Sequence, residues 1–198
     1  MRDSLIRYAL YLLLVTASPV VLAHADHVHG NAFVVGFTHP VLGLDHLLAM
    51  VAVGLVSAVI GGRAIWQVPL AFVVAMVAGG LLGGYDVELP GVEIGISASV
   101  IALGAALAIG RRVPYALTLT FVALFGVMHG HAHGTEMPEM AEPLLYGAGF
   151  VSGTVGLHLF GVGLGLLSTR IPKGAELLRV SGLAGCAIGV FLLGTLFV

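Results

Sequence analysis

The stretch GVEIGISASVIALGAALAIG, residues 91–110, is followed by the short connection RRV and then by PYALTLTFVALFGVMHGHA, residues 114–132. Each run is almost wholly apolar and has about the 20 residues that an α-helix needs to cross a bilayer. The two arginines between the runs are typical of a connection on the cytoplasmic side of a membrane. The stretch therefore predicts two transmembrane helices joined by a short loop.

The composition of the whole chain agrees with this pattern. Its 198 residues are 59% hydrophobic and 9% charged, whereas a soluble domain carries about 25% charged residues. The net charge of -2 leaves no basic excess, so we expect no nucleic-acid partner. Apolar stretches lie near residues 33–60, 66–84, 91–110, 114–132, 143–168 and 177–198. We therefore expect an all-α integral membrane protein with six transmembrane helices, forming one domain over residues 26–198.

The N-terminal segment, residues 1–25, has the pattern of a secretory signal peptide. Arg2 and Arg7 precede an apolar core, and the small residues Ala23 and Ala25 offer a cleavage site. The alternative is an uncleaved additional helix. We predict cleavage, which places the mature N-terminus outside the cytoplasm.

Charges in the predicted connections indicate the orientation. If the helices alternate, all six basic residues beyond the signal peptide fall on one side and the acidic loop residues fall on the other. Lysine and arginine are enriched in cytoplasmic loops. The basic residues are Arg63, Arg111, Arg112, Arg170, Lys173 and Arg179. We therefore expect a bacterial inner-membrane protein whose mature N-terminus and C-terminus are both periplasmic.

Glycine recurs at every fourth position in several predicted helices, as at Gly126, Gly130 and Gly134. Small residues at this spacing let transmembrane helices approach closely. The pattern predicts tight helix packing and leaves open whether the chain forms a homo-oligomer.

The first cluster of ionisable residues, His39, Asp45 and His46, opens the first predicted helix. Such side chains cost at least a few kcal/mol in hydrocarbon unless they are paired, hydrated or bound to metal. His39 and His46 are seven residues apart, so two helical turns place them on one side. Pro40 and Gly43 allow an irregular backbone that brings Asp45 to them. Asp45 is then either a ligand or the acceptor of a ligating histidine's spare N–H.

The second cluster ends the fourth predicted helix. His129, His133 and Glu136 are spaced i, i+4 and i+7, so on a helix they share one face, as metal ligands do. His131 belongs to the same group but points elsewhere. A hydrated polar loop is the alternative. The predicted topology places both clusters toward the outer side at similar depth, which indicates one shared metal site.

A ninth histidine, His158, lies well inside the fifth predicted helix. It is either a hydrogen-bonding partner between helices or an inner step for a cation that crosses the membrane.

Imidazole and carboxylate groups together suit a divalent transition metal. No Gly-x4-Gly-Lys-Ser/Thr loop is present in the sequence, which indicates that the chain has no ATPase of its own. We expect a secondary metal importer that is not an enzyme and holds no prosthetic group. A membrane haem-binding protein, a metal-dependent membrane hydrolase and a metal sensor without transport are the alternatives.

The two clusters resemble the motifs of the HupE/UreJ family of nickel/cobalt permeases. His-x5-Asp-His is matched by His39, Asp45 and His46, and Phe-His-Gly-x-Ala/Val-His-Gly-x-Glu is matched by residues 128–136, with Met128 in place of the phenylalanine. The resemblance extends over the whole chain. It implies transport of Ni2+, or of Co2+ as the usual alternative, often for hydrogenase or urease maturation, and metal binding at the matched His, Asp and Glu positions.

Overall fold

The computed structural model describes residues 31–109, 113–138 and 142–198. These residues form helices joined by short connections. The helices are α2 (Ala32–Leu42), α3 (Leu44–Ile60), α4 (Ala64–Gly84), α5 (Val92–Ile109), α6 (Tyr115–Thr135), α7 (Pro143–Ser168) and α8 (Gly174–Thr195). The predicted signal peptide, residues 1–25, lies outside the described residues.

Five of these helices, α4 to α8, are long and apolar enough to cross a membrane. Their bounds lie within three residues of the apolar stretches predicted from the sequence. This agreement confirms the expectation of an all-α, multi-pass membrane protein. Helix α6 extends to Thr135, so His129 and His133 lie on a helix and Glu136 directly follows it.

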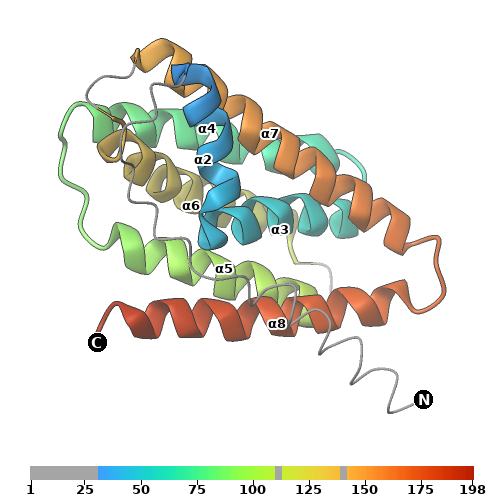
Figure 1. Cartoon of the computed structure of the whole chain (residues 1–198). Coiled ribbons are helices and arrows are strands. Elements are labelled where there is room, and N and C mark those ends of the chain that lie inside the picture. Colours follow the sequence, from blue (N-terminus) through green and yellow to red (C-terminus); the bar gives the residue numbers. More distant parts are fainter. Residues whose placement is uncertain (1–30, 110–112, 139–141) are drawn as a thin grey trace.

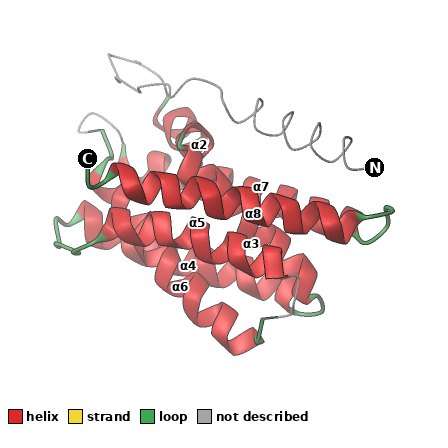
Figure 2. Cartoon of the chain, turned by 90° about the horizontal axis from the view of Figure 1, so that it is seen from below, coloured by secondary structure: helices red, strands yellow, loops and turns green. Residues whose placement is uncertain are grey.

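The first predicted span, residues 33–60, is broken rather than continuous. Helices α2 and α3 meet at Gly43 with a bend of 81°, and α2 is seen nearly end-on in Figure 2 while the other helices run across the view. Gly43 has an extended backbone, with φ -79° and ψ 115°, which ends α2 and starts α3. The pair counts as a sixth span only if both helices are taken together. The irregular backbone predicted around Pro40 and Gly43 is thus present.

Helix α3 lies at the centre of the molecule. It packs against α7 on one side and against α4 and α5 on the others, while α4 pairs with α6, α5 with α8, and α2 with α7 (Figure 1). Ala49, Met50 and Val53 on α3 are fully buried. Met50 is therefore a core residue of the packed helices.

Close helix approach depends on glycine, as the sequence predicts. A side chain at Gly79 of α4 would overlap the backbone of Val127, and one at Gly130 of α6 would overlap the backbone of Met76. Backbone contact at this range explains the tight α4–α6 pair and holds the second histidine motif firmly against α4.

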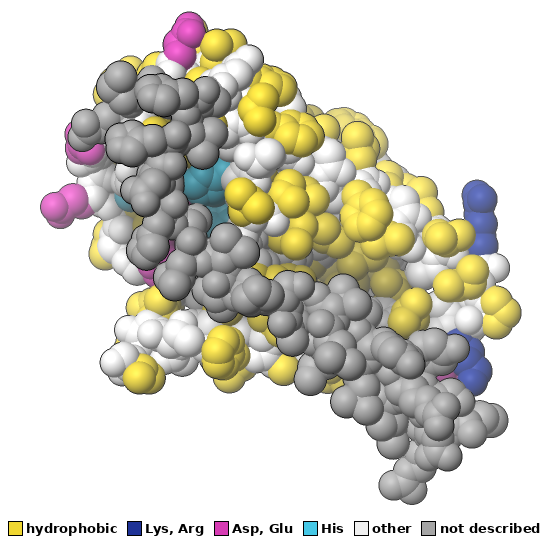
Figure 3. Space-filling view, in the orientation of Figure 1, with side chains coloured by type: hydrophobic (Ala, Val, Ile, Leu, Met, Phe, Trp, Pro, Cys, Tyr) yellow, Lys and Arg dark blue, Asp and Glu magenta, His cyan; other side chains and the backbone are white. Residues whose placement is uncertain are grey.

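The outward faces of the helices are apolar, which a surface in water would not tolerate over such an area. Exposed residues on these faces include Leu70, Val74, Leu81, Leu159, Phe160, Leu183, Val190 and Phe191. Charges gather at the ends instead. Figure 3 shows acidic side chains at one end of the face in view, basic side chains at the other, and histidine near the acidic end.

Candidate metal centre

The two predicted clusters meet at the acidic end of the helix bundle. His39 of α2, His133 of α6 and Glu136 offer ligand atoms that all lie within 4.8 Å of one another. His39 Nε2 is 3.2 Å from Glu136 Oε2. The His39 and Glu136 side chains are 31% and 52% exposed, whereas His133 is buried. The group therefore opens to the outside on one side and leads into the protein on the other.

Four imidazoles continue inward from this opening in the order His39, His133, His46, His129, which we call the histidine row. Ring centroids are 4.6 Å apart for His39 and His133, 4.2 Å for His133 and His46, and 4.6 Å for His46 and His129. The rings come from α2, α3 and α6. The bend at Gly43 makes the row possible, because it turns His39 and His46 toward α6 from two differently directed helices.

Hydrogen bonds set which nitrogen of His46 is free. His46 Nδ1 is 2.8 Å from Asp45 Oδ1, and the His46 backbone N–H donates to the same oxygen. A carboxylate only accepts, so Nδ1 carries the proton and Nε2 keeps its lone pair. His46 Nε2 is buried and has no partner among the described residues. Asp45 thus acts on the row by orienting His46, one of the two roles that the sequence left open.

Ser99 of α5 orients His129 in the same way. Its hydroxyl donates to the carbonyl of Ile96 at 2.6 Å and lies 2.9 Å from His129 Nε2. With its proton already used, the Ser99 oxygen accepts the Nε2–H of His129. His129 Nδ1 is left with a free lone pair, buried and unpartnered within the described residues. Such secondary partners orient metal-binding histidines.

His133 has no hydrogen-bond partner at either ring nitrogen among the described residues. It lies between His39, His46 and the Phe150 ring, whose centroid is 3.9 Å away. An unsatisfied buried polar group costs roughly 1–3 kcal/mol. A side chain that has two such atoms and faces two other imidazoles is chemically suited to bind a cation.

Tyr146 supports the outer end of the row. Its hydroxyl is 3.2 Å from His39 Nδ1, and the residue is only 3% exposed. Tyr146 lies in the first turn of α7, where an interfacial aromatic residue would be expected, but packing of α7 against α2 accompanies its burial. Trp66 and Tyr85, by contrast, are exposed at helix ends, as a belt requires.

His131 lies apart from the row. Its Nε2 donates to the backbone carbonyl of Val87 at 2.7 Å, so it ties α6 to the connection between α4 and α5. Its position two residues from both His129 and His133 points it to the opposite side of α6. It was included among the predicted metal ligands, and the structure does not bring it to them.

His158 of α7 lies deeper than the row. The Phe72 ring lies between the row and His158. Its centroid is 5.6 Å from that of His129 and 5.2 Å from that of His158. Neither His158 nitrogen has a partner among the described residues, so the predicted alternative of a hydrogen bond between helices is not observed.

Glu93 also lies near the opening. Its carboxylate is exposed in the first turn of α5 and interacts electrostatically with Glu136, Asp45 and His46. Three carboxylates therefore give the opening a negative potential that favours cations.

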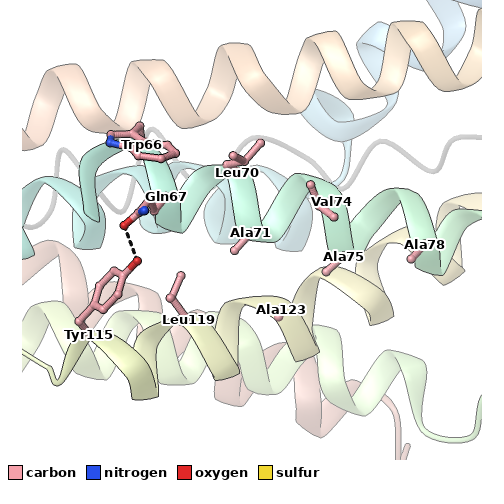
Figure 4. A pocket seen from close by; sticks show the side chains of 10 residues that line it. All are labelled: Trp66, Gln67, Leu70, Ala71, Val74, Ala75, Ala78, Tyr115, Leu119 and Ala123. Carbon is pink, nitrogen blue, oxygen red and sulfur yellow. Dashed lines mark hydrogen bonds between the residues drawn. The ribbon is translucent and has the colours of Figure 1, made fainter. Parts of the chain in front are cut away.

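Sequence reasoning missed Ser99, Phe72, Phe150 and the role of Tyr146. Ser99 was visible as a hydroxyl in an apolar run, but nothing local indicates which histidine it faces. A shallow groove between α4 and α6 (Figure 4) is lined by ten residues, none of them histidine, cysteine or carboxylate. It offers no metal ligand.

Comparison with known proteins agrees with the motif resemblance. The family described as "HupE / UreJ protein" matches residues 12–192, a range that includes the whole histidine row and His158. The chain belongs to the HupE/UreJ family. It is 42% identical over 175 residues to "Protein HupE" of Rhizobium leguminosarum bv. viciae, which covers 87% of this chain and 90% of that protein. No solved structure matches.

Membership in the HupE/UreJ family also bears on catalysis. Its members are membrane transporter-like accessory proteins rather than enzymes. The expectation that the chain is not an enzyme is thereby confirmed, and the hydrolase alternative is removed.

Proposed function

We propose that this HupE/UreJ protein is a secondary transporter that imports a divalent transition metal ion, Ni2+ or else Co2+, across the bacterial inner membrane. The observation that carries the proposal is the histidine row, with the unpartnered nitrogens of His46, His129 and His133 gathered behind the opening at His39 and Glu136. Imidazole nitrogen with one or two carboxylates is a donor set that nickel and cobalt accept.

The positions of the charged residues support transport of the metal ion from the periplasm into the cytoplasm. Glu136 lies at the opening of the row and the exposed Glu93 lies in the first turn of α5, whereas Arg170 and Lys173 lie in the connection at the opposite end of α7. Under the positive-inside rule the row faces the periplasm. A dication that moves inward gains about 4.6 kcal/mol per 100 mV of membrane potential, twice the value for one charge. No chemical energy source within the chain is then needed.

The geometry favours a compact ion over haem. Neighbouring rings in the row are 4.2–4.6 Å apart between centroids, too close for a porphyrin to lie between two axial histidines. A sensor that binds metal without moving it has the same ligands, so transport itself must be measured.

The deciding experiment is uptake of radioactive nickel into cells that express the wild type or His129→Ala, with cobalt, zinc and manganese as competitors. We expect uptake by the wild type, loss of most of it in the variant at equal membrane abundance, and competition by cobalt before manganese. Ser168→Ala, which removes a buried hydroxyl bonded to the carbonyl of Gly165, is the matched control. No uptake above empty cells would contradict transport and leave the sensor as the better explanation.

A further inference from the structure

Beneath the histidine row lies a second group of buried side chains with nitrogen, oxygen and sulfur atoms that the capture site does not use. His158 is 1% exposed, Thr154 is fully buried and Met76 is 1% exposed. Thr154 Oγ1 lies 3.6 Å from Met76 Sδ. Thr154 and His158 are one turn apart on α7, and Phe72 and Met76 are one turn apart on α4, so the four side chains fill one small region between these helices.

This region is continuous with the row along a single face of α7. Tyr146, Phe150, Thr154 and His158 follow one another at every fourth position, so each lies about one turn beyond the last and about 40° further round the helix, and all four are on its buried side. Tyr146 contacts His39 and Phe150 contacts His133. The same helix face therefore runs from the outer opening to His158.

The position of His158 is rigid. A side chain at Gly54 of α3 would overlap the His158 backbone carbonyl, and one at Gly161 of α7 would overlap the backbone of Val51. Helices α3 and α7 thus touch along their backbones at this level. An imidazole held on such a support, with both nitrogens buried and unpartnered among the described residues, makes no hydrogen bond between helices there.

We propose that His158, Met76 and Thr154 form a second, inner metal-binding site that carries no charge of its own. The inference rests on the proposed function, since it gives the imported ion a stage after capture. Imidazole, thioether and hydroxyl groups favour transition metals such as nickel, cobalt or copper over Mg2+, Ca2+ and Mn2+, which prefer carboxylates and water. The inner site therefore selects against the abundant hard cations.

Neutrality also determines how tightly this site holds its ion. At the histidine row the carboxylates of Glu136 and Asp45 would offset part of the charge of a bound cation. No carboxylate is bonded to His158 within the described part of the chain. A dication at His158 keeps its full charge, so it binds weakly and leaves easily, as conduction through successive sites requires.

The test compares His158→Leu and Met76→Leu with the wild type in purified, reconstituted protein. We expect His158→Leu to lower the maximal rate of nickel uptake by about 10–100-fold while KM changes less than about twofold, because capture at the row is intact. Met76→Leu, which keeps the side-chain volume, should lower the rate less and admit more manganese. Thr118→Val is the control, since the hydroxyl of this buried threonine on α6 donates to the carbonyl of Pro114 at the start of the same helix.

Equilibrium nickel binding to the protein in detergent gives an independent readout. The wild type should show two binding events, of which His158→Leu loses the weaker and keeps the tighter. Wild-type uptake and two unaltered events in His158→Leu would overturn the inner site. If the wild type binds nickel but does not transport it, the proposed function fails, and the loss or survival of the weaker event still decides the inner site. Should His158→Leu not fold, Met76→Leu decides by its manganese selectivity.

Discussion

At the scale of single residues, the histidine row depends on neighbours that hold each imidazole in one orientation. Asp45, Ser99 and Tyr146 each bond one nitrogen of a histidine. His46 and His129 are left with one free lone pair each. His133, which has no such partner among the described residues, is instead confined by Phe150 and by its neighbours in the row. Orientation therefore comes from residues on three helices, α3, α5 and α7, of which only α3 also carries a histidine of the row.

Tyr146→Phe should weaken metal capture without changing the fold. The hydroxyl that bonds His39 Nδ1 is lost while the buried ring remains. Loss of such a supporting bond lowers metal affinity by about 10-fold or more. We expect KM for nickel uptake to rise by about that factor. Tyr115→Phe is the control, because its hydroxyl bonds Gln67 at the opposite end of the bundle. An unchanged KM in Tyr146→Phe would show that His39 needs no support.

Ser99→Ala should affect both stability and affinity. It leaves the Nε2–H of fully buried His129 without an acceptor, a cost of roughly 1–3 kcal/mol. We expect a lower melting temperature in detergent and weaker nickel binding. Ser97→Ala, at an equally buried position of the same helix, should change neither by as much. Equal effects of the two substitutions would refute a special role for Ser99.

At the scale of elements, the break between α2 and α3 is the feature that builds the opening. A straight helix over residues 33–60 would place His39 and His46 on one side, but at different depths. The 81° bend instead lets His39 reach Glu136 while His46 reaches His129 and His133. One helix pair thereby supplies the outermost ring of the row, His39, and its third ring, His46.

Gly43→Ala tests this junction. The backbone angles of Gly43 suit any residue, but a methyl group there would lie 3.1 Å from Asp45 Oδ1 and 3.3 Å from His46 Nδ1. The Asp45–His46 bond must then shift. We expect initial uptake at low nickel concentration to fall by about 10-fold at unchanged protein abundance. Gly84→Ala, where the added methyl meets open space, should transport like the wild type. Normal uptake by Gly43→Ala would mean that the row tolerates displacement of His46.

At the scale of the whole molecule, the segregation of charge predicts the orientation in the membrane. Single cysteines introduced as Glu88→Cys and Arg170→Cys lie in exposed connections at opposite ends. In a Cys186→Ala background, an impermeant maleimide added to spheroplasts should label the first and leave the second unlabelled until the membrane is opened. Labelling in the reverse pattern would invert the orientation and turn the proposed importer into an exporter.

The membrane-spanning helices and their bounds could be predicted from the sequence, because the length and hydropathy of an apolar run are local properties. The bounds of α4 to α8 were predicted within a few residues for this reason. The two motifs were also recognisable, since i, i+4 spacing on a helix is local. The angle at Gly43 was not, because an extended glycine permits a bend while packing of α2 against α7 sets its size.

The sequence by itself therefore determined a multi-pass helical membrane protein, the polarity of its charged ends and the set of ionisable residues within it. Only the tertiary structure decided that His131 faces Val87, that Tyr146 turns inward to His39, and that Phe72 lies between His129 and His158. The physical reason is that hydropathy and spacing act along one helix. Contacts between side chains depend instead on how the helices pack. That packing is set where glycines let the backbones of helices far apart in the chain approach each other.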